Sequence, residues 1–160
     1  MGQKRAMWVV VALTLLAASP ALADMHGKKL GVGVGGGTIA NGLTAKYYLT
    51  ENTALQVMLG QRFRHGVSVG ADYVMEFAPL AKGGAGRLFW GAGVGAGLLL
   101  YDVGVNQSNI IGVSGIVELG WHLQALPLEL IVDWRPTYFI GDYLDGLWLG
   151  GGGGAIRWYF

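Results

Sequence analysis

Apolar and polar side chains alternate with a period of two along most of this chain. In the segment 128–135, one set of alternate residues is apolar: Leu128, Leu130, Val132 and Trp134. The residues between them are mostly charged: Glu129, Ile131, Asp133 and Arg135. Because successive side chains of a β-strand point to opposite faces, this pattern predicts a strand with one apolar and one polar face. The segments 67–77 and 114–124 alternate in the same way, so the pattern favours an all-β fold.

The apolar content is high for a chain whose apolar segments are short. Hydrophobic residues make up 52% of the sequence. After residue 23, the best candidate for a continuous apolar segment is 88–101, which is shorter than the about 20 residues of a membrane-spanning helix and contains four glycines. Only helices and closed barrels satisfy their backbone polar groups inside hydrocarbon. Hydrophobicity spread over short alternating segments therefore predicts a transmembrane β-barrel.

Eight alternating segments separated by turn residues predict an eight-stranded antiparallel barrel. The expected strands are residues 30–39, 43–49, 54–62, 67–77, 87–101, 110–123, 128–138 and 147–160. Asn41–Gly42 is typical of a tight hairpin between the first two. An even number of strands places both termini of the chain on the periplasmic side, with the connections near 40, 63, 106 and 142 external. All connections are short, and we expect no room for a plug.

The polar face of each strand is expected to point into the barrel, because a charge at the bilayer midplane costs about 2–4 kcal/mol. This places nine charged residues in the lumen: Lys46, Arg62, Asp72, Glu76, Glu118, Glu129, Asp133, Arg135 and Arg157. Acids and bases are nearly balanced in this set, so they can pair with one another. An eight-stranded barrel is only wide enough for its own side chains. We therefore expect a lumen filled by ion pairs, with no open pore.

The first 23 residues have the features of a cleaved signal peptide. Lys4 and Arg5 precede an apolar run, and Ala21–Ala23 is a small-x-small cleavage motif. Residues 24–160 then form the barrel domain. The chain has no cysteine, which excludes disulfides and thiolate metal sites. It has no basic excess for nucleic acid, its three histidines show no metal-ligand spacing, and we expect no cofactor.

The last strand alternates up to the final residue. One face carries Ile156, Trp158 and Phe160, and the other carries Ala155, Arg157 and Tyr159. This segment resembles the closing strand of bacterial outer-membrane barrels, where a terminal Phe with aromatics behind it is the assembly signal. The whole chain after residue 23 resembles the small outer-membrane barrel superfamily that includes the OmpA transmembrane domain. No peptidoglycan-binding domain follows the barrel, so that anchoring role of OmpA is not expected.

The resemblance implies a location in the Gram-negative outer membrane and a monomer. Its implied partners are outer-membrane lipids and lipopolysaccharide, the barrel assembly machinery and periplasmic chaperones. Two girdles of aromatic side chains are expected at the membrane interfaces. The periplasmic girdle would contain Trp121, Trp158, Tyr159 and Phe160, with Phe77 and Trp90 as further candidates. The outer girdle would contain Tyr101, Tyr138 and Trp148.

The sequence leaves three functions open. The leading hypothesis is a non-enzymatic barrel that serves envelope structure or surface interaction. The second is a lipid A or phospholipid hydrolase that uses Ser114, Glu118 and His122, which share one strand face. The third is a narrow solute pore. The glycines at 31, 33 and 36 match a dinucleotide-binding fingerprint, but no helical pattern follows them, and we interpret them as strand glycines.

Overall fold

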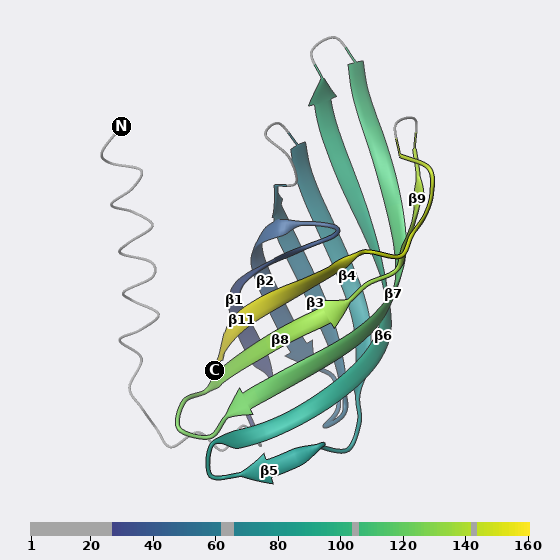
Figure 1. The fold of residues 1–160 in the computed structure, drawn as a ribbon. Coiled ribbons are helices and arrows are strands. Elements are labelled where there is room, and N and C mark those ends of the chain that lie inside the picture. Colours follow the sequence, from purple (N-terminus) through teal and green to yellow (C-terminus); the bar gives the residue numbers. More distant parts are fainter. Residues whose placement is uncertain (1–26, 62–65, 104–105, 142–143) are drawn as a thin grey trace, which may run out of the picture.

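The computed structural model describes residues 27–61, 66–103, 106–141 and 144–160. These residues form a closed eight-stranded antiparallel β-barrel (Figure 1), which confirms the predicted all-β class and strand number. The predicted signal peptide, residues 1–23, lies outside the described residues. Within the described ranges, no helix is long and apolar enough to cross a membrane.

Neighbouring strands of the barrel wall pair antiparallel all the way round. The strands are β1 (Leu30–Gly37), β2 (Asn41–Tyr48), β3 (Thr53–Gln61), β4 (Gly66–Glu76), β5 (Ala81–Gly83), β6 (Gly86–Val103), β7 (Asn106–Leu123), β8 (Leu128–Trp134), β9 (Thr137–Ile140), β10 (Gly146–Trp148) and β11 (Gly152–Tyr159). β1 pairs with β11, which closes the barrel. The short β5 pairs with the beginning of β6 at the edge of the sheet.

The last two barrel strands are each divided into two segments. The predicted strand 128–138 is split into β8 and β9 around Pro136, which has no backbone N–H to donate. The amide of Gly115 still donates to the carbonyl of Pro136 at 3.0 Å, so this segment stays against β7. The predicted strand 147–160 is split into β10 and β11 by residues 149–151, which lie opposite residues 135–136. An extra residue on one strand is a β-bulge, which bends the strand locally.

The barrel has two distinct ends. The proximal end, at the bottom of Figure 1, contains the start of β1, the end of β11 and the turns at 49–52, 84–85 and 124–127. At the opposite, distal end, β6 and β7 rise above their neighbours (Figure 1). The expected strands 87–101 and 110–123 are shorter than β6 and β7 as the structure has them. Residues 106–109, where an external connection is expected, belong to β7 and pair with β6.

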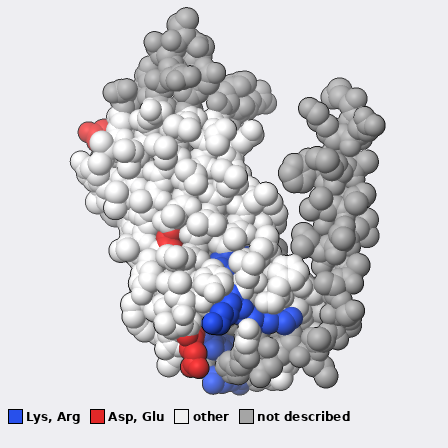
Figure 2. Space-filling view, turned by 180° about the vertical axis from the view of Figure 1, so that it is seen from behind, with Lys and Arg blue, Asp and Glu red and all other residues white. Residues whose placement is uncertain are grey.

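The wall of the barrel separates apolar from polar side chains as the alternation predicts. The outward residues are apolar and about half exposed on every barrel strand, among them Val34, Leu43, Val57, Val69, Val94, Val113, Val132 and Ile156. Figure 2 shows this wall almost free of charged atoms, with most of the Lys and Arg atoms near one end. The inward residues include a set of buried polar and charged groups: Thr44, Lys46, Gln56, Ser68, Glu76, Ser114, Glu118, His122, Glu129, Thr137 and Arg157.

The turn between β1 and β2 folds into the distal half of the barrel. Its tip, Ile39, is 4% exposed and Ala40 is 0% exposed. Both pack in an apolar cluster that we call the plug: Ile39, Ala40, Leu99, Ile110 and Phe139. The expectation that no plug is present is therefore wrong. The predicted Asn41–Gly42 turn is also wrong, because both residues are paired in β2 and the turn is formed by residues 38–40.

Glycines on three neighbouring strands make room for Ile39. A Cβ atom added at Gly97 on β6 would lie 2.3 Å from Ile39 Cγ2, and one added at Gly112 on β7 would lie 2.9 Å from Ile39 Cδ1. At Gly70 on β4 the corresponding distance to Ile39 Cγ2 is 3.2 Å. The turn is also attached to β11, since the amide of Gly152 donates to Thr38 Oγ1 at 2.7 Å. The plug is therefore held by contacts with the strands of the wall: Ile39 packs against the glycines of β4, β6 and β7, and Thr38 is hydrogen-bonded to β11.

Candidate functional site: the charge network inside the barrel

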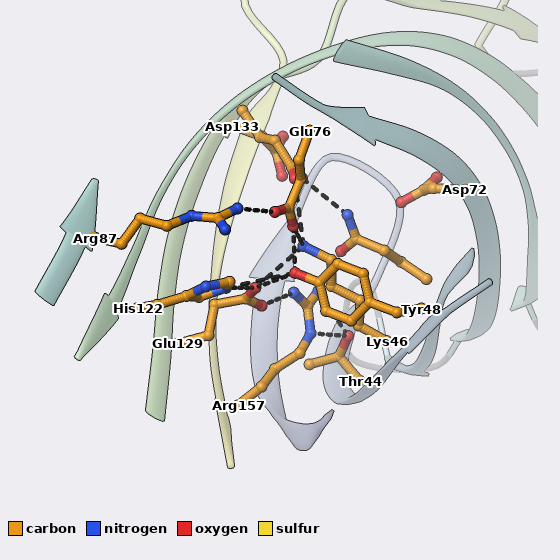
Figure 3. A network of polar contacts seen from close by, with 12 residues as sticks. Thr44, Lys46, Tyr48, Asp72, Glu76, Arg87, His122, Glu129, Asp133 and Arg157 are labelled. Atoms are coloured by element: carbon orange, nitrogen blue, oxygen red, sulfur yellow. Dashed lines mark hydrogen bonds and ion pairs between the residues drawn. The ribbon is translucent and has the colours of Figure 1, made fainter. Parts of the chain in front are cut away.

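Lys46 on β2 lies at the centre of a buried charged cluster in the proximal half of the lumen (Figure 3). Its ammonium nitrogen Nζ is 2.7 Å from Glu76 Oε1 and 3.1 Å from Glu129 Oε2. A third carboxylate oxygen, Glu118 Oε1, is 3.5 Å away. These three acids come from β4, β8 and β7, so a single cation connects three strands to β2. We call Lys46, Glu76, Glu118, Glu129 and Arg157 the Lys46 cluster.

Glu129 receives the largest number of contacts in the cluster. Besides Lys46, its Oε1 accepts a hydrogen bond from Arg157 Nη1 at 2.8 Å. Its Oε2 lies 2.8 Å from His122 Nε2 and accepts from the Tyr159 hydroxyl at 3.1 Å. The side chain of Glu129 is fully buried. A buried carboxylate is tolerated only when it is paired and hydrogen-bonded, and Glu129 meets this requirement.

Two neutral side chains link Arg157 to the rest of the cluster. Arg157 Nε and Nη2 donate to Thr44 Oγ1 at 3.2 and 3.1 Å. Arg157 Nη2 also donates to Gln56 Oε1. Gln56 Nε2 then donates to Glu118 Oε2 at 2.8 Å. The donors and acceptors therefore form a continuous network around the inner wall (Figure 3).

Glu76 connects the cluster to the proximal opening. It accepts hydrogen bonds from the Tyr48 hydroxyl and, at 3.0 Å, from Arg87 Nη2. The Arg87 side chain is 28% exposed, whereas the Glu76 side chain is 1% exposed. The guanidinium of Arg87 lies 5.5 Å from the ring centroid of Phe89, which is itself buried. Arg87 and the rings of Tyr48 and Phe89 therefore separate the Lys46 cluster from solvent at this end.

A second charged layer lies between the Lys46 cluster and the plug. Arg135 donates from Nη1 and Nη2 to the two carboxylate oxygens of Asp72, both at 2.9 Å. Arg135 Nε also donates to Asp133 Oδ1 at 3.3 Å. This bidentate geometry is the strong form of an arginine–carboxylate pair. A cavity of about 10 Å³ separates this layer from Arg157 and Gln56, which is space for about one water molecule.

The structure brings together eight of the nine charged residues predicted for the lumen. Arg62 is the ninth, and it lies outside the described residues. Arg87 was missed, although it pairs with His122 across β6 and β7 and shares the inward phase of Phe89. The two-residue spacing between Arg87 and the apolar Phe89 was the sequence signal that could have placed Arg87 on the inward face. Arg87 directly follows the turn 82–86, so the sequence alone does not separate it from the turn residues.

The predicted assembly residues lie on the outward face of β11. Ile156 is 50% exposed and Phe160 is 48% exposed, and Trp158 is half-buried beside them. Tyr159 is fully buried and points into the lumen, so its expected place in the aromatic girdle is wrong. Tyr159 is two residues from Arg157, so both side chains point to the same, inward face of the strand. Of the other girdle residues, Tyr101 has a side chain outside the described part.

The remaining members of the two expected girdles point outward. On the proximal side, Trp121 is 41% exposed, and Phe77 stacks on Trp90 with ring centroids 4.4 Å apart. On the distal side, Tyr138 and Trp148 are 49% and 53% exposed. The orientation of these side chains therefore agrees with the expectation.

Three ligand-type side chains of the network come close enough to suggest a metal site. Glu76, His122 and Glu129 each offer an atom within 4.8 Å of the others, although the sequence spacing of the histidines gave no sign of this. The Lys46 ammonium contacts both carboxylates of this group. A divalent cation would have to share that space with a fixed positive charge. The donor set is therefore better explained as the binding site for the Lys46 side chain.

The three residues of the hydrolase hypothesis do not assemble into a catalytic triad. Ser114 and His122 are eight positions apart on β7, which is about 26 Å at about 3.3 Å per residue. Ser114 Oγ is 2.8 Å from Thr137 Oγ1, whereas His122 lies beside Glu129 near the proximal opening. A nucleophile and its base must lie within hydrogen-bonding reach. A hydrolase built from these three residues therefore has no geometric support.

Comparison of the chain with protein-family models, with curated proteins and with solved structures found no match. The resemblance to the OmpA-like superfamily therefore stays a prediction beyond the barrel itself. The glycines of the nucleotide fingerprint lie in β1, which is followed by β2 and not by a helix. At Gly33 a Cβ atom would lie 1.8 Å from the carbonyl oxygen of Ile156, so close strand pairing explains this glycine.

Proposed function

We propose that this chain is an integral β-barrel of the bacterial outer membrane with a closed, side-chain-filled lumen. It serves the structure of the envelope rather than transport or catalysis. The observation that carries the proposal is the opposite polarity of the two faces of one closed wall: apolar residues outside, buried ion pairs inside. A water-soluble barrel would need a polar outer surface, because large exposed apolar surfaces are rare on soluble monomers.

The proposed absence of conduction is supported by three layers of side chains across the lumen. The plug occupies the distal half, the Asp72–Arg135 layer lies below it, and the Lys46 cluster occupies the proximal half. The charged layers are paired internally, so they do not present a row of free charges of one sign to a passing ion. Selective channels use such rings of free charges or carbonyls.

The distal hairpin of β6 and β7 offers a surface for contacts outside the membrane. β6 pairs with β4 as far as Tyr101, and β7 pairs with β9 from Ile111 onward. Beyond these positions, the described residues of the hairpin pair only with each other, up to Val103 and Asn106. Surface interaction through this hairpin is therefore compatible with the structural role.

Purified protein folded in detergent and reconstituted in lipid vesicles tests the proposal. We expect a change of gel mobility on heating, resistance of the barrel to protease in vesicles, and no single-channel conductance in planar bilayers. Loss of protease resistance in vesicles would contradict a membrane barrel. Stable, stepwise conductance would contradict a filled lumen while leaving the membrane location in place. Altered lipid A acyl chains in an overexpressing strain would instead favour the hydrolase hypothesis.

A further inference from the structure

The positively charged side chains that the structure describes outside the lumen gather at one end of the barrel. Among the described residues, four bases lie outside the lumen or at its mouth, and all four are at the proximal end: Lys28, Lys29, Lys82 and Arg87. We call them the basic rim. Figure 2 shows most of the Lys and Arg atoms near one end, with a largely uncharged wall above them. The charge is therefore concentrated at one border of the apolar belt.

Each pair of rim residues is held near the mouth by the strands. Lys82 and Arg87 lie directly opposite each other in the β5–β6 ladder. Lys28 Nζ is 3.5 Å from the carbonyl oxygen of Tyr159, while Lys29 is exposed just before β1. Arg87 uses Nη2 on Glu76, but its Nε is buried without a hydrogen-bond partner among the described residues. The accessible donors of the rim are therefore the exposed ammonium groups of Lys29 and Lys82.

Few acids compensate this charge. In the part of the chain that the structure describes, Glu51 is the one acid outside the lumen at the proximal end. Asp145 is exposed at the distal end, where the described residues include no base outside the lumen. In the described part of the chain, the two ends of the barrel therefore differ in charge, with the positive end proximal. An anionic partner attracted by this charge would approach the barrel from the proximal side.

Aromatic side chains border the basic rim. Trp121 lies on β7 next to His122, which pairs with Arg87, and its ring is 41% exposed. Phe77 and Trp90 stack on the outer surface just above β5, and Phe160 is exposed at the end of β11. Tryptophan and other amphipathic rings take positions at the level of lipid headgroups. The rim is thus at the height where lipid phosphates would lie beside a membrane-spanning wall.

We propose that the basic rim binds the phosphate headgroups of anionic phospholipids in the leaflet at the proximal end. This inference rests on the membrane-barrel function proposed above. Lysine and arginine clusters next to a membrane attract anionic lipids, with an effect of about fivefold in binding for each base. The exposed ammonium groups of Lys29 and Lys82 supply the phosphate contacts. The leaflet at this end is the periplasmic one in the predicted orientation, so phospholipid is the expected ligand rather than lipopolysaccharide.

Tryptophan quenching by brominated lipids tests this inference, because Trp90, Trp121 and Trp158 lie near the rim. The folded full-length protein is reconstituted in vesicles of neutral phosphatidylcholine that contain either brominated phosphatidylglycerol or brominated phosphatidylcholine. We expect phosphatidylglycerol to bind several-fold more tightly, and high salt to weaken this preference. K82Q should reduce this preference, and K28Q/K29Q should reduce it further, towards equal binding of the two lipids. D145N, at the distal end, is the matched control and should leave the preference unchanged.

Two results would overturn the inference. Equal quenching by the two brominated lipids in the folded, inserted protein would show that the rim has no anionic ligand. An unchanged preference in both K82Q and K28Q/K29Q would show that the ligand binds elsewhere. In either case the barrel remains inserted, so the membrane-barrel proposal is unaffected. Failure of the unmodified protein to insert would instead contradict that proposal.

Discussion

At the scale of single residues, Lys46 has the largest effect that we expect from one side chain. Its ammonium group is fully buried and contacts three carboxylates. A buried charge cluster contributes little net stability when complete, because desolvation offsets the attraction. Removal of one partner is different, since it leaves the opposite charges buried without compensation.

K46M should therefore destabilise the barrel by about 3–5 kcal/mol, because Glu76, Glu118 and Glu129 lose their shared cation. The measurement is the free energy of unfolding in urea, followed by tryptophan fluorescence in vesicles of neutral phosphatidylcholine. K29M is the matched control, since Lys29 is exposed, and it should change the free energy by no more than about 0.5 kcal/mol. Similar values for the two variants would show that Lys46 is not the centre of the network.

The identity of the lumen residues could be predicted because the sequence alternates strictly. Glu129, Asp133 and Arg135 share one phase, and their positions follow from it alone. The partners could not be predicted, because the distance between Lys46 and Glu118 depends on how β2 and β7 face each other across the barrel. Period-two alternation assigns a face but contains no information on what lies opposite.

At the scale of elements, the inward β1–β2 turn is the part of the fold that could not be predicted from the sequence. Residues 38–40 are as apolar as an ordinary strand segment, and we included 38 and 39 in the first strand. The evidence for an inward turn is distributed over Gly70, Gly97 and Gly112, which belong to three other strands. Each of these glycines is also consistent with a simple need for strand bending. Their common contact, Ile39, becomes apparent only when the strands are placed side by side.

A double-mutant cycle on Ile39 and Gly97 should show this contact. The Cβ of G97A would lie 2.3 Å from Ile39 Cγ2, so we expect a loss of about 1–3 kcal/mol from overpacking. I39A alone should cost about 2–5 kcal/mol through lost burial. In I39A/G97A the clash with Ile39 Cγ2 is absent, while the carbonyl oxygen of Val69 stays 3.1 Å from the new Cβ, so the combined loss should be smaller than the sum of the two. G83A is the control, because nothing lies within 4 Å of a Cβ at Gly83.

The measurement for this cycle is again the free energy of unfolding in vesicles. Additive losses would mean that Ile39 does not occupy the space beside Gly97. That result would also contradict the plug, because the same contact holds the turn in the lumen. A coupling of about 1 kcal/mol or more is expected for side chains in direct contact.

At the scale of the whole molecule, closure joins the first and last strands of the described chain. β1 and β11 pair from Gly31 and Tyr159 to Gly37 and Gly153. The amide of Phe160 adds a hydrogen bond to the carbonyl of Leu30 at 2.9 Å. This closure removes the free edges that would otherwise pair with other chains. The ring of Phe160 takes no part in it, since the ring points outward and is 48% exposed.

The predicted role of Phe160 as an assembly signal can be tested separately from its role in closure, because the ring would carry the first and the backbone amide carries the second. F160A keeps the backbone hydrogen bond to Leu30 and removes only the outward ring. We expect the variant to refold in detergent with a yield close to that of the unmodified protein. In cells the amount of folded barrel in the outer membrane should fall several-fold, because recognition of the strand, and not its stability, is lost. Heat-modifiable protein in isolated membranes is the measurement for the second effect.

Y138A is the matched control for F160A, because Tyr138 is an outward aromatic residue with a similar exposure of 49%. Removal of either ring takes a comparable amount of apolar surface from the wall, so the two variants should refold alike. Only F160A should reduce assembly in cells. Equal losses in cells for both variants would mean that the ring of Phe160 acts through general packing against lipid. A loss for F160A in detergent as large as in cells would mean that the ring is needed for folding itself.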